Sequence, residues 1–133
     1  MISYLDFEML VKINKDVVSL TKELHEYTER DSEKLRSILR DVRSKGKNAE
    51  LREAITQKVS ALIYGIASGQ PFHEGNKRTA LVASLAFLEM NGFTMDIRNP
   101  ELVSLLDRAG IGLTSLNDAY SVCLLYTSPS PRD

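Results

Sequence analysis

Apolar residues recur every three or four positions in the first quarter of the chain, with polar residues between them. This spacing predicts a helix from about residue 6 to residue 27, because side chains three and four positions apart share one helix face. Asp6 is expected to be its N-cap. The predicted buried face consists of Leu5, Met9, Ile13, Val17, Leu20 and Leu24.

The same periodicity predicts two further helices. One follows Asp31 and ends at the polar segment 44–48, SKGKN, which contains a glycine. The other runs from about residue 49 to residue 67, and Gly69 and Pro71 end it. Their predicted buried faces are Leu35, Ile38, Leu39 and Val42 in the first, and Ile55, Val59, Leu62 and Ile66 in the second.

The most apolar segment is residues 79–90, TALVASLAFLEM, which predicts a helix surrounded by other helices. Gly92 ends it, and FTMDI, residues 93–97, is a short extended piece. Two more helices are predicted near residues 100–109 and 115–122. Because strand patterns are nearly absent, the predicted fold class is all-α, a compact helical bundle around a buried central helix.

Composition narrows the class of protein. The chain has 133 residues, of which 43% are hydrophobic and 26% charged, which fits one globular domain. A net charge of −1 argues against a broad nucleic-acid surface, which needs excess Lys and Arg. Neither a membrane-spanning run nor a signal peptide is recognisable, and a single cysteine cannot form an internal disulfide. We expect a cytoplasmic protein without nucleic-acid or membrane partners.

Residues 70–78, QPFHEGNKR, place unusual chemistry just before the most apolar helix. Asn76 is expected to be the N-cap of that helix, and Gly75 lets the backbone approach a ligand closely. The unpaired N–H groups of a first helical turn carry about half a positive charge and bind anions, usually phosphate. Lys77 and Arg78 oppose the helix dipole there, which makes sense if an anion binds between them.

Two other residues of this segment have predicted roles. Glu74 is suited to Mg²⁺ that bridges phosphate oxygens. Phe72, between polar neighbours, is expected to anchor the loop in the core. The alternative for the whole segment is a capped helix start with solvated charges.

The segment QPFHEGNKRTA resembles the Fic/Doc (Fido) signature, H-P-F-x-[D/E]-G-N-x-R, at the eight consecutive positions from Pro71 to Arg78, two of which are free. The helix that follows, TALVASLAFLEMNGF, and the upstream segment HEYTERDSEKLRSIL, residues 25–39, are also similar to that family. The resemblance covers most of residues 3–122 and implies a small all-α fold whose central helix opens on a nucleoside triphosphate.

The resemblance also implies roles for individual residues. Glu74 holds Mg²⁺, Gly75 and Asn76 form the phosphate cradle, and Arg78 contacts a phosphate of ATP. Members that transfer AMP usually have Gly where this chain has Lys77, and an Arg where it has Leu81.

The sequence NKRTAL therefore resembles the Doc (death-on-curing) branch. That branch transfers the γ-phosphate of ATP to a protein hydroxyl. The implied reaction of this chain is therefore phosphoryl transfer, and adenylyl transfer is the alternative. Its members are toxins that modify a translation elongation factor and are restrained by a small antitoxin, so the implied partners are a translation factor and an antitoxin.

One position departs from the family pattern. The motif begins with a His that takes the proton of the attacking hydroxyl, and this chain has Gln70, whose amide cannot accept a proton near neutral pH. Gln70 either orients the nucleophile, or His73 at the first free motif position serves as the base, or the site binds nucleotide without turnover. His73 and His25 are the only histidines, and a solvated or structural role is the alternative for both.

Other features bear less directly on the site. Tyr64 precedes the loop and either reaches the ligand or packs on the core. SKGKN is short for the strand-like flap that aligns the target in this family. The inhibitory motif S/T-x-x-x-E-G/N is incomplete. Ser19 and Glu23 have the required spacing, but Leu24 stands where the motif has Gly or Asn.

The last eleven residues, 123–133, CLLYTSPSPRD, break from the helical pattern. The string is similar to a transposase-type sequencing adaptor read through in one frame. We therefore expect residues 1–122 to form a C-terminally truncated Fic/Doc-like domain, and residues 123–133, with Cys123, to be a non-native tail. A disordered native tail is the alternative.

Three functional hypotheses follow. The first is a Doc-branch enzyme that binds Mg·ATP and modifies a protein hydroxyl. The second is a nucleotide-binding regulator that has lost turnover because Gln70 replaces the base. The third is a helical interaction domain without a ligand.

Overall fold

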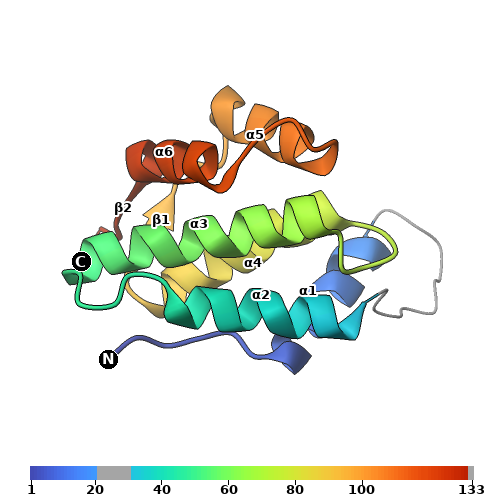
Figure 1. The fold of residues 1–133 in the computed structure, drawn as a ribbon, viewed down its shortest axis with the longest axis horizontal. Helices are drawn as coiled ribbons and strands as arrows, with labels where there is room; N and C mark the ends of the chain where they lie inside the picture. Colours follow the sequence, from blue (N-terminus) through green and yellow to red (C-terminus); the bar gives the residue numbers. More distant parts are fainter. Residues whose placement is uncertain (21–30, 132–133) are drawn as a thin grey trace.

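The computed structural model describes residues 1–20 and 31–131, which form six helices and two short strands (Figure 1). The helices are α1 (Phe7–Ser19), α2 (Ser32–Ser44), α3 (Leu51–Gly69), α4 (Asn76–Met90), α5 (Pro100–Gly110) and α6 (Leu116–Tyr126). The strands β1 (Phe93–Met95) and β2 (Thr127–Pro129) pair antiparallel. The predicted all-α class is confirmed.

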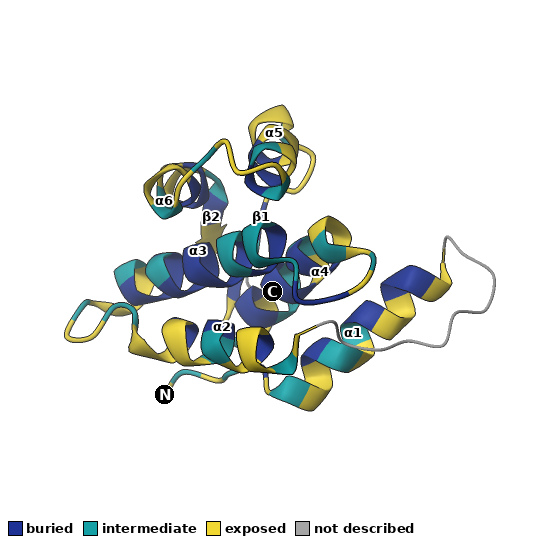
Figure 2. Ribbon diagram, turned by 45° about the vertical axis from the view of Figure 1, so that its right-hand side comes forward, coloured by how far each residue is buried: buried dark blue, intermediate teal, exposed yellow. Residues whose placement is uncertain are grey.

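The helices lie in three layers (Figures 1 and 2). Helices α3 and α4 form the middle layer, with α1 and α2 on one side and α5 and α6 on the other. The central helix is α3, which contacts α2, α4, α5 and α6, rather than the helix predicted over residues 79–90. Helix α4 keeps an exposed edge that includes Val82 and Met90. No helix in the described ranges has the length and apolar character that a bilayer span requires.

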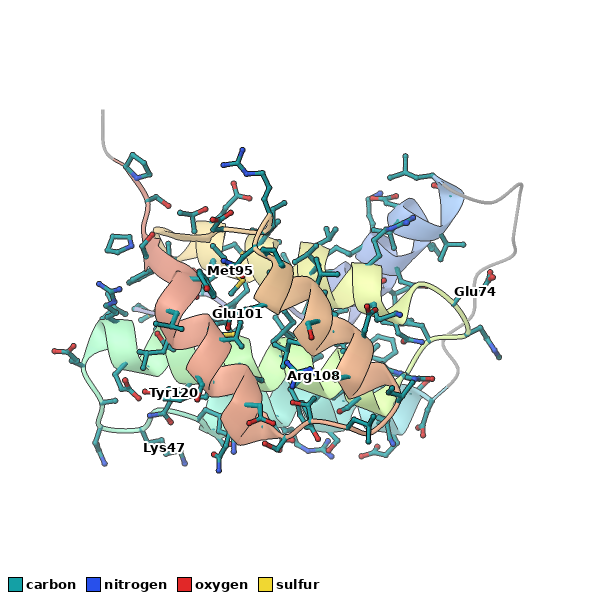
Figure 3. The ribbon with its side chains drawn as sticks, turned by 90° about the horizontal axis from the view of Figure 1, so that it is seen from above. Lys47, Glu74, Met95, Glu101, Arg108 and Tyr120 are labelled. Atoms are coloured by element: carbon teal, nitrogen blue, oxygen red, sulfur yellow. The ribbon has the colours of Figure 1, made fainter. Side chains whose placement is uncertain are left out.

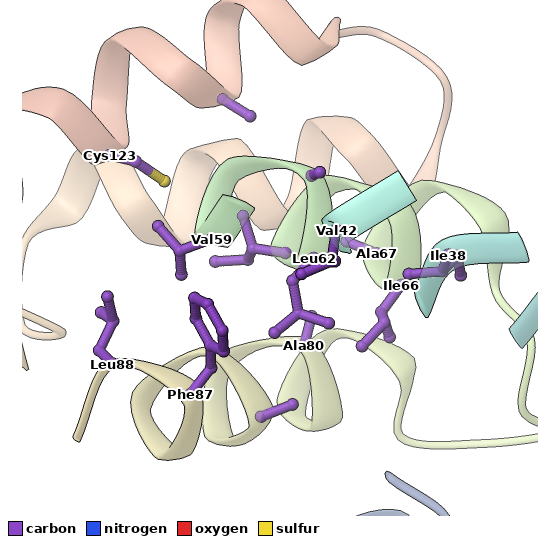
Figure 4. Close-up of a cluster of buried hydrophobic side chains, with 14 of the residues drawn as sticks. Ile38, Val42, Val59, Leu62, Ile66, Ala67, Ala80, Phe87, Leu88 and Cys123 are labelled. Atoms are coloured by element: carbon purple, nitrogen blue, oxygen red, sulfur yellow. The ribbon is translucent and has the colours of Figure 1, made fainter. Parts of the chain in front are cut away.

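The core forms where α3 meets its neighbours (Figure 4). Val59, Leu62 and Ile66 of α3 are at most 1% exposed and belong to one apolar cluster with Ala80 and Phe87 of α4. Burying each of the larger side chains contributes about 1.5–3 kcal/mol. This packing fixes α4 against α3 and thereby positions the loop that joins them.

Helix α1 shows the predicted N-cap, because the Asp6 side chain accepts a hydrogen bond from the Met9 N–H at 2.8 Å. The predicted buried face is partly wrong: Met9 and Leu20 are exposed. The side chains that face the core lie mostly one position later, and they are Leu10, Asn14, Val17 and Val18. The helix is described only to Ser19, so its predicted extension to residue 27, including Leu24, lies outside the described residues.

Helices α2 and α3 follow the prediction closely. Asp31 caps α2 through the Lys34 N–H at 3.0 Å, and the segment from residue 45 to residue 50 that joins the two helices forms turns without a strand. Gly46 has φ +71°, and a Cβ there would lie 2.7 Å from the Ala54 Cα, so only glycine fits. This short turn does not extend into a strand-like flap.

The C-terminal segment corrects one prediction. Helix α6 continues past residue 122 to Tyr126, with Cys123 fully buried, and β2 then pairs with β1. The helix therefore does not end at Val122, because Cys123 and Tyr126 continue the face that packs on the core cluster. The predicted non-native origin of residues 123–133 stays a prediction.

Candidate functional site

The predicted site residues, from Gln70 to Arg78, lie in the loop between α3 and α4 and in the first turn of α4. Gln70 is the C-cap of α3 in the left-handed conformation, with φ +49°. Its side-chain Nε2 donates a hydrogen bond to the Gly110 carbonyl oxygen, 2.8 Å away, at the end of α5. The residue at the base position of the motif is thus tied to a neighbouring helix.

Phe72, which we expected to anchor the loop, has its side chain fully buried in the core cluster. Asn76 has a different role from the predicted N-cap. Its Oδ1 accepts from the Phe72 N–H and its Nδ2 donates to the Phe72 carbonyl oxygen, both at 3.0 Å. Asn76 is the first residue of α4, and the N-cap is Gly75. The prediction failed because the Asn76 side chain turns back to close the loop rather than forward to the helix.

Gly75 gives the loop its shape. Its φ is +72°, which suits glycine, and a Cβ there would approach the Val18 side chain to 3.1 Å. A left-handed residue followed by helical residues aligns successive N–H groups into a concave anion site. The first bond of α4 runs from the Thr79 N–H to the Gly75 carbonyl. In the described part of the chain, the N–H groups of residues 75–78 have no acceptor.

The N–H groups of residues 75–78 form the cradle. It lies at the protein surface, since Gly75, Lys77 and Arg78 are exposed and Asn76 is partly exposed. The dipole of the fifteen-residue helix α4 places about half a positive charge there. Four free N–H groups and a helix N-terminus together can bind a phosphate.

The two cations in the first turn of α4, Lys77 and Arg78, differ in their surroundings. Arg78 is exposed and makes no hydrogen bond or ion pair with a described residue, so its guanidinium is available beside the cradle. Lys77 instead pairs with Asp107 of α5, with 2.9 Å between Nζ and Oδ1. This pair is more than half exposed and contributes little to stability.

Glu74 and His73 precede the cradle. Figure 3 shows Glu74 on the loop between α3 and α4, at the outer edge of the molecule. His73 is exposed, and His25 lies outside the described residues. Among the described residues there is no group of three or more His, Cys, Asp or Glu that could hold a metal. One carboxylate beside an anion cradle suits Mg²⁺, which commonly binds through one or two carboxylates and the phosphates of a substrate.

Sequence reasoning missed Asn14. This residue of α1 is 1% exposed, and its Nδ2 donates to the Glu74 carbonyl oxygen at 2.9 Å and to the Thr79 hydroxyl at 3.0 Å. The signal was present as an amide among the apolar positions Leu10, Val17 and Val18, but the face was predicted one residue out of register.

Two cavities lie near α3. A groove of about 310 Å³ between α2 and α3 is lined by Tyr64 and ends at Ser68 and Gly69, directly before Gln70. Tyr64 is half-buried, so it both packs on the core and faces this groove. A second cavity of about 320 Å³ lies between α3 and α6.

The second cavity contains a hydrogen-bonded pair. The Tyr120 hydroxyl donates to both carboxylate oxygens of Glu53, at 2.9 and 2.8 Å. This hydrogen bond raises the pKa of Tyr120 above its ordinary value. The pair is located on α3 and α6, away from the loop.

Comparison with protein families agrees with this geometry. Residues 4–88 match the model of the Fic/DOC family, and the match spans more than half of the chain, including the whole loop. No match was found among curated proteins. On the strength of this match, the chain belongs to the Fic/DOC family.

Proposed function

We propose that this protein binds Mg·ATP at the N-terminus of α4 and transfers a phosphoryl group to a protein hydroxyl, in the manner of the Doc branch. The observation that carries the proposal is the cradle, in which the N–H groups of residues 75–78 stand free at the protein surface. Lys77 and Leu81 support the Doc branch over adenylyl transfer, because they replace the Gly and Arg typical of AMP-transferring members.

Each of these residues has a separate role in binding the nucleotide. The N–H groups hold phosphate oxygens, and Arg78 adds charge-assisted hydrogen bonds. Glu74 would hold Mg²⁺, which would supply positive charge to offset that of the phosphates. Lys77 reaches the phosphates only if it leaves Asp107.

The reaction needs an acceptor for one proton. The hydroxyl oxygen of the target attacks the γ-phosphorus, the bond to the oxygen bridging the β- and γ-phosphates breaks, and ADP leaves. The hydroxyl proton cannot go to the Gln70 amide. Gln70 therefore acts by positioning, and the proton passes to His73 or to water.

A second candidate is a nucleotide-binding regulator without turnover. The observation that favours it is the hydrogen bond between Gln70 and Gly110, which engages the amide with the protein itself. The loss of a general base typically costs about 10²–10⁴ in rate.

We further propose a cytoplasmic location and partners of the Doc type. The target is a protein hydroxyl, by analogy on a translation factor, and the partner that restrains the protein is a small antitoxin. The family resemblance alone supports these partners.

Two measurements test the function. Calorimetric titration with Mg·ATP is expected to show saturable binding, and its absence would leave only an interaction domain without ligand. ATP labelled at the γ-phosphate or at the α-phosphate is then incubated with the protein and a cell lysate. Transfer of the γ-label supports phosphorylation, transfer of the α-label would establish adenylyl transfer, and binding without transfer would establish the regulator.

A further inference from the structure

Asn14 is a buried polar residue whose hydrogen bonds all lead to the proposed site. It comes from α1, sixty positions before the loop, and is 1% exposed. Its Nδ2 donates both hydrogens, one to the Glu74 carbonyl and one to the Thr79 hydroxyl. Because a carbonyl oxygen can only accept, the amide nitrogen must be the atom that faces Glu74. A buried amide with two such bonds fixes the groups that it contacts.

The bond to Glu74 determines where the Gly75 N–H points. A peptide unit is planar and trans, so its C=O and N–H groups point in opposite directions. Asn14 holds the Glu74 carbonyl toward α1, and the Gly75 N–H must then point away from α1, toward solvent. This N–H is the first of the four that form the cradle.

The second bond acts on the same loop from the helix side. The Thr79 hydroxyl accepts from Asn14, while the Thr79 N–H donates to the Gly75 carbonyl at 2.8 Å. Val17 and Val18 of α1 lie beneath Gly75, with side-chain carbons 3.6 and 3.1 Å from a Cβ built there. Helix α1 thus forms the floor of the loop on both sides of Gly75.

We infer that Asn14 is a positioning residue for the phosphate cradle, holding the Glu74–Gly75 peptide with its N–H toward the ligand. The inference rests on the proposed nucleotide binding for its functional meaning. Helix α1 lies outside the signature motif, yet through Asn14 it orients the N–H group of Gly75, which binds the anion.

The first test uses the ligand-free protein. Nuclear magnetic resonance is expected to detect a scalar coupling across the hydrogen bond between the Asn14 Nδ2 and the Glu74 carbonyl carbon, and fast solvent exchange of the Gly75 amide. In Asn14→Leu, which has a similar volume and no donor, the Gly75 amide resonance is expected to shift. Absence of the coupling in the wild type, or an unchanged Gly75 resonance in the variant, would overturn the inference.

The second test measures binding of tripolyphosphate and of Mg·ATP. Asn14→Leu is expected to weaken both about 10- to 100-fold, the worth of one hydrogen bond to a charged group. The control is Leu10→Ala, which destabilises α1 from a fully buried position one turn earlier, where the side chain has no polar group to bond the loop. At matched folded fractions, the control is expected to bind within about threefold of the wild type.

The outcomes separate the two proposals. Equal loss in Asn14→Leu and Leu10→Ala, or no loss in Asn14→Leu, would overturn the positioning role while leaving nucleotide binding intact. If the wild type binds neither probe, the proposed function fails, and the resonance of the Gly75 amide alone then decides whether Asn14 orients this peptide.

Discussion

The side-chain amide of Gln70 donates a hydrogen bond to the Gly110 carbonyl oxygen, with 2.8 Å between Nε2 and O. The position at which the family motif has its base is thereby joined to the C-terminal end of α5. An imidazole at this position has a basic nitrogen that the amide lacks, and His tolerates the left-handed backbone found here.

We therefore expect Gln70→His to raise the rate of label transfer by about 10- to 1000-fold, within the range of a restored general base. The measurement is transfer from labelled ATP to the target under single-turnover conditions. Gln70→Ala is the matched control, since it breaks the bond to Gly110 without supplying a base. An equal gain in both variants would mean that release of α5, rather than proton transfer, limits the rate.

Arg78→Ala is expected to weaken Mg·ATP binding about 10- to 100-fold, because a charge-assisted hydrogen bond to phosphate is lost. The free energy of unfolding should barely change, since Arg78 is exposed and has no partner among the described residues. Calorimetry and urea denaturation measure the two effects. Arg98→Ala removes the same charge from another exposed site, and an equal loss of affinity there would indicate a long-range charge effect.

Asn76→Ala is expected to lower the free energy of unfolding by about 1–3 kcal/mol, because the N–H and C=O of Phe72 both lose their partner. Nucleotide binding should weaken as well, since the loop that presents the cradle is no longer closed. Denaturant titration measures the first effect. Asn117→Ala, an exposed asparagine on α6, serves as the control. A stability loss within about 0.5 kcal/mol of that control would contradict the closing role.

The helices could be predicted from the sequence wherever the apolar pattern was unambiguous. Helices α2 and α3 each have one apolar stripe. The stripe of α2 includes Ile38 and Val42, that of α3 includes Val59 and Ile66, and the structure buries all four side chains. In α1 two possible buried faces are offset by one residue. The face that contains Met9 was predicted over the face that contains Leu10, because the latter also contains the polar residue Asn14. Periodicity treats Asn14 as polar, whereas its bonds to Glu74 and Thr79 satisfy it inside the protein.

The sequence identified the residues of the candidate site, but it could not predict which residues they contact. The motif pointed to Phe72 as an anchor, and the structure buries it. The bonds from Gln70 to Gly110 and from Lys77 to Asp107 join residues 40 and 30 positions apart. Such pairings depend on how α5 docks beside the loop, which no local pattern encodes.

Lys58→Met is expected to lower the free energy of unfolding by about 2–4 kcal/mol. Lys58 is 4% exposed, and its Nζ donates to the carbonyl oxygens of Val42, Arg43 and Lys45 at 2.8–3.2 Å. It thus satisfies the C-terminal carbonyls of α2 and places a cation at the negative end of the helix dipole. Thermal and urea denaturation measure the loss. Lys12→Met, at a largely exposed position, should change stability by less than about 0.5 kcal/mol.

Cys123 allows a direct test of the C-terminal segment. Its side chain is fully buried, and burial raises the pKa of the thiol from 9.0 to about 11. At pH 8 the thiolate fraction of a group with that pKa is about a hundredfold lower than that of a free cysteine, and only the thiolate is nucleophilic. We expect alkylation of the native protein at pH 8 to be at least about a hundredfold slower than alkylation in denaturant.

Raising the pH should speed the native reaction about tenfold per unit until the pH approaches 11, whereas the reaction in denaturant levels off near pH 9, because the thiolate fraction rises only up to the pKa of each thiol. If residues 123–131 instead form no ordered structure in solution, α6 ends before Cys123, and the thiol reacts in native buffer as fast as in denaturant. Mass spectrometry of the alkylated protein distinguishes these outcomes. Slow labelling would establish that α6 extends into this segment whatever its origin, while fast labelling would restore the boundary that the sequence pattern placed near residue 122.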